Sequence, residues 1–150
     1  MDKIFLEKVN LQNCIITPHL GEFSQMIGID VKEIEKDILS YGKDFAVKNK
    51  CILVLKGAPT IIFNPNGEAL INTTGNSGMA KFGSGDVLTG VIAGILSQNK
   101  NPEAAAIAGI YLHSLSADLL LSEKPISNYL ASDVMNNYPI AVKFLEGSIV

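Results

Sequence analysis

Two short apolar runs, in which no polar residue alternates with the hydrophobic ones, predict buried strands at Cys14–Thr17 and Cys51–Leu55. Such runs are typical of strands that are covered on both faces of a sheet. Pro18 ends the first run, because proline has no N–H to donate to a central ladder. A turn follows at Pro18–Gly21.

A tight turn separates the next two apolar runs, Thr60–Phe63 and Ala69–Ile71. The turn is Asn64-Pro65-Asn66-Gly67, and an Asn-Gly pair tolerates the positive φ angles that hairpin turns need. We therefore predict that these two runs are the arms of a hairpin.

Hydrophobic residues at helical spacing predict the remaining elements. Between Val31 and Asn49 they recur every three or four residues with Lys and Glu between them, and Asp30 is suited to cap this helix. The segment Asp86–Ser97 is apolar on most sides, which predicts a buried helix. Further helices are predicted at Glu22–Ile27, from Asn101 to about Leu121 with proline in the first turn, and as two short terminal helices at Ala131–Tyr138 and Ile140–Leu145.

The order of strands and helices predicts an α/β layered fold with a largely parallel sheet. The length of 150 residues suggests a single domain, residues 1–150. A composition of 47% hydrophobic and 18% charged residues favours a folded chain over a disordered one. A net charge of −3 without a Lys/Arg stripe argues against a nucleic-acid partner.

We expect a soluble cytoplasmic protein with no membrane partner, because no apolar run is expected to reach the length of a membrane span and no signal peptide precedes the first element. Cys14 and Cys51 lie far apart in the sequence, and two cysteines are too few for a disulfide framework or a zinc site. We expect both to be small buried core residues, with a catalytic thiol as the alternative.

The sharpest chemical feature is a glycine-rich segment, Asn72–Gly90. Gly83-Ser84-Gly85 stands directly before a predicted helix, where free N–H groups and the positive end of the helix dipole favour a phosphate. A Walker A loop is excluded, because no Gly-Lys-Ser/Thr ends the segment.

Asp86, in the first turn of that helix, has two readings. An aspartate there can simply favour the helix N-terminus. A carboxylate beside a phosphate site also makes sense if it accepts a proton from a substrate hydroxyl during phosphoryl transfer.

These residues carry a resemblance to a known family. Gly75-Asn76-Ser77-Gly78-Met79-Ala80 and Gly83-Ser84-Gly85-Asp86-Val87-Leu88-Thr89-Gly90 resemble the anion-hole signature of the ribokinase-like superfamily, in the form found in the ADP/ATP-dependent NAD(P)H-hydrate dehydratases. Further segments that resemble this branch are Thr17-Pro18-His19-Leu20-Gly21-Glu22-Phe23, Lys56-Gly57-Ala58-Pro59-Thr60, Tyr111-Leu112-His113-Ser114-Leu115 and Ala131-Ser132-Asp133. The resemblance covers about residues 14 to 138.

The resemblance implies a three-layer α/β/α ribokinase-like fold, of which this chain is the C-terminal part of the dehydratase domain, with the sheet incomplete on its N-terminal side. It implies repair of a damaged cofactor: the S-form of hydrated NADH or NADPH loses water and the reduced cofactor returns. The co-substrate would be ADP, giving AMP and phosphate, or ATP, with Mg²⁺. Phosphorylation of the hydrate's hydroxyl would turn a poor leaving group into a good one.

The resemblance also implies roles for individual residues. Asp86 is the expected base and hydrate contact, His19 a second hydrate contact, and Asn76 a contact to phosphate or magnesium, with no direct protein ligand to a metal. The expected anion hole is Gly83, Ser84 and Gly85, and the expected nucleotide-binding residues are Lys56, Gly57, Ala58, Pro59, Thr60 and Gly85.

Lys81-Phe82 departs from the family pattern, which has a small residue before the anion hole, and Leu20 replaces a proline. The implied partners are hydrated NADH or NADPH, ADP or ATP, and either further copies of this chain or a complementing N-terminal polypeptide. Two alternatives stay open: a small-molecule kinase of the same superfamily acting on a hydroxymethyl group or sugar, and a non-catalytic fragment that binds nucleotide.

Several residues have simpler expected roles. His113 is predicted to be a packing histidine, and Met79 a flexible filler beside the loop. Asp118 and Asp133 are predicted to be helix-surface or capping residues, and Glu22 to favour its helix N-terminus.

Overall fold

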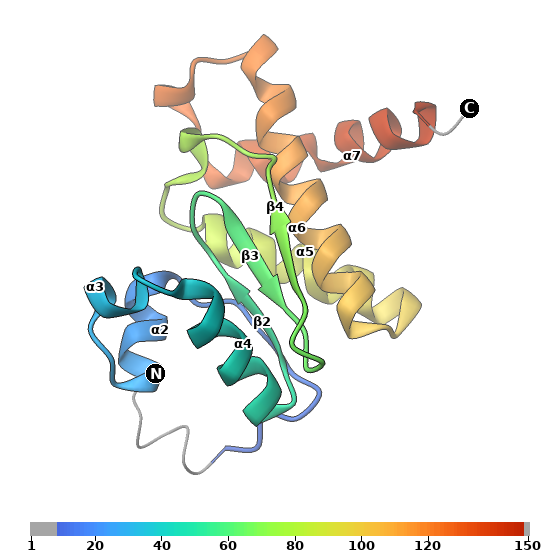
Figure 1. Ribbon diagram of the computed structural model, residues 1–150. Coiled ribbons are helices and arrows are strands. Elements are labelled where there is room, and N and C mark those ends of the chain that lie inside the picture. Colours follow the sequence, from blue (N-terminus) through green and yellow to red (C-terminus); the bar gives the residue numbers. More distant parts are fainter. Residues whose placement is uncertain (1–8, 149–150) are drawn as a thin grey trace. The chain divides into compact units, whose positions relative to one another are not determined.

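The computed structural model describes residues 9–148, which form four strands and six α-helices (Figure 1). The chain divides into two compact units, one ending at Thr73 and the other beginning at Thr74. The first unit contains β1 (Ile15–Ile16), α2 (Leu20–Ile27), α3 (Val31–Ile34), α4 (Ile38–Asn49), β2 (Ile52–Leu55), β3 (Thr60–Phe63) and β4 (Ala69–Asn72). The second contains η1 (Ser77–Met79), α5 (Ser84–Asn99), α6 (Pro102–Leu119), η2 (Leu120–Ser122), η3 (Ile126–Asn128) and α7 (Ala131–Gly147).

The four described strands form one mixed sheet in the order β1-β2-β3-β4. β1 runs parallel to β2, whereas β2–β3 and β3–β4 are antiparallel, so the expectation of a largely parallel sheet is wrong for these strands. The reason lies in the connections. Only β1 and β2 are joined through helices; the loop between β2 and β3 is far too short for the crossover that parallel strands need.

The predicted hairpin is confirmed as β3 and β4, and its turn is built by Asn64. The Asn64 side-chain oxygen accepts hydrogen bonds of 3.0 Å from the N–H groups of both Asn66 and Glu68. Gly67 has φ +84°, the left-handed conformation that Asn-Gly turns need.

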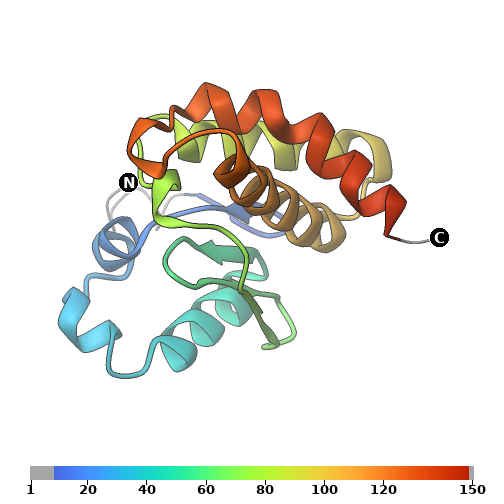
Figure 2. The ribbon, with the colours of Figure 1, turned by 90° about the horizontal axis from the view of Figure 1, so that it is seen from above.

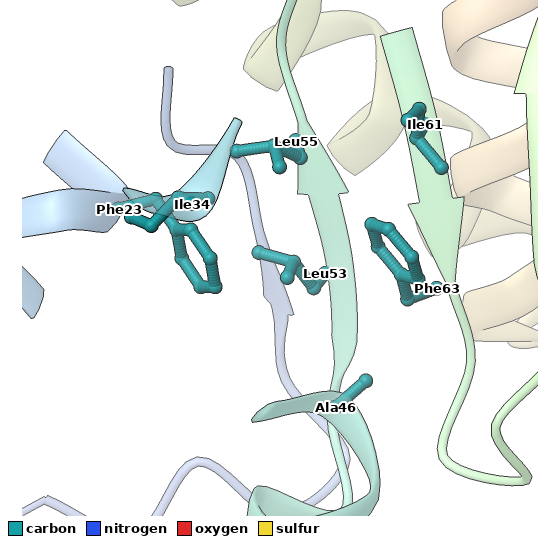
Figure 3. Packing of buried hydrophobic residues seen from close by; sticks show 7 residues of the cluster. All are labelled: Phe23, Ile34, Ala46, Leu53, Leu55, Ile61 and Phe63. Carbon is teal, nitrogen blue, oxygen red and sulfur yellow. The ribbon is translucent and has the colours of Figure 1, made fainter. Parts of the chain in front are cut away.

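The core of the first unit lies between the sheet and its helices. Leu53 and Leu55 from β2 and Ile61 and Phe63 from β3 face Ala46 of α4, with Phe23 and Ile34 completing the cluster (Figure 3). Phe23 also packs edge-on against Phe45, with ring centroids 5.4 Å apart. The alternate side chains of β2 are buried too, as the unbroken apolar run predicts.

One long helix was expected over Val31–Asn49, and the structure instead has α3 and α4 with a break between them. Asp30 caps α3 as predicted, accepting from the Lys32 N–H at 2.9 Å. Asp37 then leaves the helical conformation and caps α4 by accepting from the Ser40 N–H at 3.1 Å. A second N-cap inside the apolar periodicity restarts the helix, because the cap satisfies an otherwise unpaired N–H.

The second unit is helical, with α5, α6 and α7 packed against one another (Figure 2). α6 is buried along most of its length, whereas only Ser84, Leu88 and Ile92 of α5 are buried. The prediction of a buried helix there is therefore wrong for most of its faces, since small apolar residues such as Gly90, Ala93 and Gly94 are exposed.

α7 is a single helix, although two helices separated near Pro139 were predicted. Proline removes only one backbone donor from the helix. The buried residues Val134, Asn137 and Ala141 lie on both sides of Pro139, and their packing holds the helix together across it.

Pro102–Ser122 is long and apolar enough, by length and composition, to cross a membrane, with mean hydropathy 1.5. The expectation that no apolar run reaches that length is therefore wrong. Of this window, 61% is buried inside the structure, and the core helix of a soluble protein passes the same test.

Candidate functional site

The N-terminus of α5 forms the predicted anion-binding turn. Gly83 precedes the helix with φ +86°, a left-handed conformation in which a Cβ would be strained. The Ser84 N–H donates to the Lys81 carbonyl at 3.2 Å, so this N–H is turned inward. Within residues 9–148 the N–H groups of Gly83 and Gly85 have no such bond, and they are the donors left for a ligand.

Asp86 lies in the first turn of α5 with its side chain exposed. Its N–H donates to the Gly83 carbonyl at 3.1 Å, which closes the turn. No side-chain hydrogen bond caps this helix, so Asp86 does not act as the N-cap. An exposed carboxylate beside two free N–H donors is free to accept a proton from a bound hydroxyl group.

Asn76 is held inside its own loop. Its amide nitrogen donates to the Ala117 carbonyl and to the Asp118 carboxylate, both at 3.0 Å, and its amide oxygen accepts from the Gly78 N–H at 3.0 Å. The second carboxylate oxygen of Asp118 accepts from the Gly75 N–H at 2.7 Å. Both amide hydrogens of Asn76 are thus occupied, which leaves only its oxygen with capacity for a further contact.

Tyr129 lies behind this loop. Its hydroxyl donates to the Ala117 carbonyl at 3.1 Å, and its ring lies so close to Gly78 that a Cβ there would be 2.5 Å from the ring. Burial and the charge of Asp118 raise the pKa of the Tyr129 hydroxyl, and the hydrogen bond with Asn76 partly opposes this rise. Met79 packs against the same cluster, as predicted.

The sequence did not predict the roles of Asp118 and Tyr129, which hold the glycine-rich loop, or of Asn137, which bonds to α6 beside them. Asp118 was expected on the helix surface or as a cap, and it instead fixes the loop. Tyr129 and Asn137 were not singled out; the Asn137 amide donates to the Ser116 carbonyl at 2.8 Å, beside the loop's anchor point. Asp118 offered a signal, a carboxylate in the otherwise apolar stretch Ala117–Leu121, whereas Tyr129 and Asn137 have polar neighbours and offered none. Asp133 caps α7 as predicted, accepting from the Leu130 N–H at 2.7 Å.

His113 is buried in α6, which confirms the packing role. Burial lowers the pKa of its imidazole to about 4, and a hydrogen bond with the backbone of Ser84 opposes that shift. Its Nε2 is buried without a partner among the described residues. His113 is therefore neutral at pH 7 and lies against the first residue of α5.

In the first unit, His19, Glu22 and Lys56 form one cluster at the carboxyl ends of β1 and β2. The His19 N–H donates to Glu22 Oε2 at 2.7 Å, and the Glu22 N–H donates to His19 Nδ1 at 3.1 Å, a reciprocal capping box for α2. Lys56 Nζ lies 3.7 Å from Glu22 Oε2, and the Lys56 N–H donates to the Pro18 carbonyl at 2.8 Å.

Glu22 is the centre of this cluster. Burial alone would raise the pKa of its carboxyl group, but the His19 N–H and the charge of Lys56 outweigh burial, and the net pKa is lowered. The expected preference of Glu22 for the helix N-terminus is confirmed, and the carboxylate also holds Lys56 beside His19. Ligands in open α/β sheets bind at such carboxyl ends of parallel strands.

The predicted nucleotide segment, Lys56–Thr60, is the loop after β2 together with Thr60, the first residue of β3. The Thr60 hydroxyl donates to the Gly57 carbonyl at 3.1 Å, which closes the loop on itself. Gly57, Ala58 and Pro59 are exposed, and the peptide bond between the last two is cis.

Lys81 and Phe82, which depart from the family pattern, lie immediately before the anion-binding turn. The Phe82 side chain is fully exposed, and Lys81 Nζ donates to the Ser127 carbonyl at 3.4 Å. The bulky residue is thus turned out to solvent, and Gly83 still adopts its left-handed conformation.

The predicted site residues fall into two groups. His19 and the loop Lys56–Thr60 meet in the first unit, and Asn76 and Gly83–Asp86 belong to the second. Within the part of the chain that the structure describes, no three His, Cys, Asp or Glu side chains gather to hold a metal ion.

A family model described as NAD(P)H-hydrate dehydratase matches residues 4–139. The ADP-dependent (S)-NAD(P)H-hydrate dehydratase of Bacillus subtilis is 39% identical over 132 residues, which is 88% of this chain and 48% of that protein. The bifunctional NAD(P)H-hydrate repair enzyme of Moorella thermoacetica is 38% identical over 90% of this chain and 26% of its own length. The chain thus spans half or less of these curated relatives.

Solved structures agree with these relatives. A crystal structure of the Bacillus subtilis ADP/ATP-dependent NAD(P)H-hydrate dehydratase, co-crystallised with ATP and Mg²⁺, matches with TM-score 0.83 and 38% identity, over 87% of this chain and 47% of that one. A ribokinase-like superfamily protein of Enterococcus faecalis matches with TM-score 0.75 and 33% identity, over 87% and 44%. The α/β fold is thus ribokinase-like, and by the match over residues 4–139 the chain belongs to the NAD(P)H-hydrate dehydratase family.

Proposed function

We propose that this chain carries the nucleotide and phosphoryl-transfer part of a dehydratase that restores NADH and NADPH from the S-form of their hydrates. The observation that carries the proposal is the N-terminus of α5, where the N–H groups of Gly83 and Gly85 are free beside the exposed carboxylate of Asp86. This combination provides donors for a transferring phosphoryl group and a base for the hydroxyl that receives it. The names of the Bacillus subtilis and Moorella thermoacetica relatives support the same reaction.

In this proposal Asp86 accepts the proton of the hydrate's hydroxyl as that oxygen attacks the terminal phosphoryl group of ADP or ATP. The nucleotide leaves as AMP or ADP, and the N–H groups of Gly83 and Gly85 stabilise the charge on the phosphoryl oxygens. The new phosphate ester then breaks its C–O bond, pushed by the ring nitrogen lone pair. Inorganic phosphate departs, the neighbouring ring carbon loses a proton to solvent, and the reduced nicotinamide is restored.

The first unit would supply binding. His19 Nδ1 accepts from the Glu22 N–H, and Nε2, which lies 3.6 Å from Glu22 Oε1, is the ring nitrogen that would donate to the hydrate. The Glu22 carboxylate positions the ammonium group of Lys56. The segment from Lys56 to Thr60 would contact the nucleotide. The roles of His19, of Lys56–Thr60 and of Asn76 in binding rest on the family resemblance.

Magnesium fits this proposal as a companion of the nucleotide. The described residues form no acidic cluster for a protein-only site, and Mg²⁺ characteristically binds through substrate phosphates with one or two carboxylates. Asp86 is the exposed carboxylate beside the phosphoryl-binding turn, and the free lone pair of Asn76 is the nearest amide acceptor within its loop. When bound, the ion would neutralise phosphate charge.

The chain matches 48% or less of the curated relatives' length, and we infer that turnover also needs the part of the domain that lies outside this match in the relatives. Leu70 and Ile71 of the edge strand β4 are exposed, and an apolar sheet edge favours association.

The test is hydrate turnover by the chain with Mg²⁺ and either ADP or ATP, followed by the return of reduced-nicotinamide absorbance. Turnover that needs one nucleotide supports the proposal and identifies the donor. Asp86→Asn should then lower kcat by roughly 10²- to 10⁴-fold, the usual contribution of a general base. Full turnover by Asp86→Asn would contradict the role of the base.

If the chain alone gives no turnover, the same assay is repeated with the chain extended at its N-terminus to the length of its relatives. Turnover only in that form supports the need for the complementing part. Phosphorylation of a sugar or hydroxymethyl compound, without hydrate turnover, would favour a kinase. Nucleotide binding that Asp86→Ala leaves unchanged, with no turnover in either form, would favour a non-catalytic fragment.

A further inference from the structure

The register of β1 on β2 brings the two cysteines of the chain together. Ile15 is paired with Ile52 and Ile16 with Leu53, so Cys14 and Cys51 are the next pair back along the two parallel strands. The hydrogen bond from the Ile52 N–H to the Cys14 carbonyl, 2.9 Å, shows that the ladder reaches this pair. Neighbouring strands lie about 4.8 Å apart, within the range of roughly 4.4–6.8 Å between the Cα atoms of a disulfide.

The two thiols also leave the sheet on the same face. Partners in a parallel ladder point the same way, and alternate residues of each strand share a face. Leu53 belongs to the core cluster beneath α2–α4, and Ile16 packs against it. Cys14 and Cys51 directly precede β1 and β2, and the alternation of the two strands, carried back by one residue, assigns both thiols to that face. Cys14 and Cys51 therefore lie close together in the fold, although they are far apart in the sequence.

The two cysteines differ in access. Cys51 is fully buried, whereas Cys14 is partly exposed, with its thiol 3.9 Å from the Gln12 carbonyl. Burial, together with the neighbouring Cys14, raises the pKa of the Cys51 thiol to about 11. The contribution of Cys14 to that pKa reflects the proximity of the two thiols in the structure.

We propose that Cys14 and Cys51 are a redox-active pair that forms an intramolecular disulfide by exchange with a low-molecular-weight disulfide. The Cys14 thiolate attacks one sulfur of that disulfide, which forms a mixed disulfide and releases one thiol. The Cys51 sulfur then attacks the Cys14 sulfur, and its proton passes to the departing sulfur, which leaves as the second thiol. The two protein sulfurs are oxidised by two electrons in total, and the small disulfide is reduced to two thiols.

The position of the pair gives the bond a consequence. β1 leads into His19 and β2 into Lys56, and these two residues form a parallel bridge beyond the strands. A bond between Cys14 and Cys51 would join the opposite ends of the same two strands. It would also be a labile bond, because parallel neighbours hold their Cβ atoms at about the strand spacing, wider than the roughly 3.5–4.5 Å of a relaxed disulfide.

The experiment treats the reduced, folded chain with oxidised glutathione and stops the reaction with N-ethylmaleimide. Intact mass before and after denaturation distinguishes the products. We expect the main product to have lost two hydrogen atoms in mass, to take no maleimide after denaturation, and to yield a linked Cys14–Cys51 peptide on digestion without reductant. Dithiothreitol should restore both thiols.

Two serine variants serve as matched controls, with circular dichroism to show that each is folded. Cys51→Ser should accumulate a glutathione adduct on Cys14, because the resolving thiol is gone. Cys14→Ser should stay unmodified, because Cys51 is buried. The proposal is overturned if the unmodified chain stops at a glutathione adduct on Cys14, forms only disulfides between two chains, or keeps both thiols. This outcome depends on the native chain alone and holds even if a variant fails to fold.

Discussion

The carboxylate of Asp118 accepts a 3.0 Å hydrogen bond from the side-chain amide of Asn76, and its other oxygen accepts one of 2.7 Å from the Gly75 N–H. A single side chain of α6 thus fixes the loop that leads to the anion-binding turn. Gly75 has φ +102°, and a Cβ there would come within 2.9 Å of Met79 Sδ, so the loop has little freedom to find another arrangement.

Replacing Asp118 should therefore destabilise the second unit. We expect Asp118→Ala to lower the free energy of unfolding by about 2–3 kcal/mol, because it leaves two donors without their charged acceptor. Asp118→Asn keeps one acceptor and should cost about half as much. Urea unfolding measures both effects, and amide exchange at Gly75 should quicken. Asp44→Ala, at an exposed position of α4, is the control; an equal effect from that variant would refute the role of Asp118.

The sequence was a good guide where one local rule determines the structure. The hairpin at Asn64–Gly67, the cap at Asp30 and the burial of β2 follow from turn chemistry, capping and an unbroken apolar run. The glycine-rich segment was likewise found as a helix N-terminus with free N–H groups, because glycine spacing and the following apolar helix are both visible in the sequence.

Contacts between distant residues could not be predicted in this way. The anchoring of Asn76 depends on Asp118 and Tyr129, which reach the loop only after α6 and α7 have packed. The pairing of Cys14 with Cys51 depends on the register of two strands separated by three helices. The order of helices and strands suggested a largely parallel sheet. The short connection between β2 and β3 permits only an antiparallel pair.

Glu22 offers a test of the cluster in the first unit. It accepts from the His19 N–H and lies beside Lys56, so Glu22→Ala should lower the free energy of unfolding by about 1 kcal/mol, the usual cost of a lost helix cap. Glu22→Gln can still accept the His19 hydrogen bond but carries no charge for Lys56. Because partly exposed ion pairs contribute little, we expect it to cost less than about 0.5 kcal/mol in urea unfolding. Equal losses from the two variants would mean that the ion pair, and not the cap, is the main contribution.

Two helical glycines should respond in opposite ways to the same substitution. A Cβ on Gly42 of α4 would lie 2.3 Å from the Phe63 ring, so Gly42→Ala should cost about 1–3 kcal/mol through overpacking. A Cβ on Gly94 of α5 would meet nothing within 4 Å. Gly94→Ala should therefore stabilise the chain by roughly 0.5–1 kcal/mol, because alanine is the better helix former. Thermal unfolding of the two variants measures whether each substitution stabilises or destabilises the chain. Stabilisation by Gly42→Ala would show that Phe63 does not pack on that helix as described.

The buried imidazole of His113 predicts a loss of stability in mild acid. Burial lowers its pKa from the ordinary value of 6.5 to about 4, and the hydrogen bond with the Ser84 backbone only partly opposes this shift. Between these two values the unfolded chain binds a proton that the folded chain does not, so unfolding is favoured as the pH falls. The contribution of His113 is complete above pH 6.5 and is lost as the pH approaches 4, with a span of about 3 kcal/mol.

The matched variant is His113→Asn, whose amide can replace the Nδ1 edge of the ring toward Ser84 but does not titrate. The Nε2 edge has no partner to lose among the described residues, so the variant removes the titration and little hydrogen bonding, at the cost of a small cavity. Urea unfolding at a series of pH values from 7.5 to 4.5 should give a steeper loss of stability for the native chain than for the variant. Parallel curves would show that carboxylates, and not His113, cause the acid sensitivity.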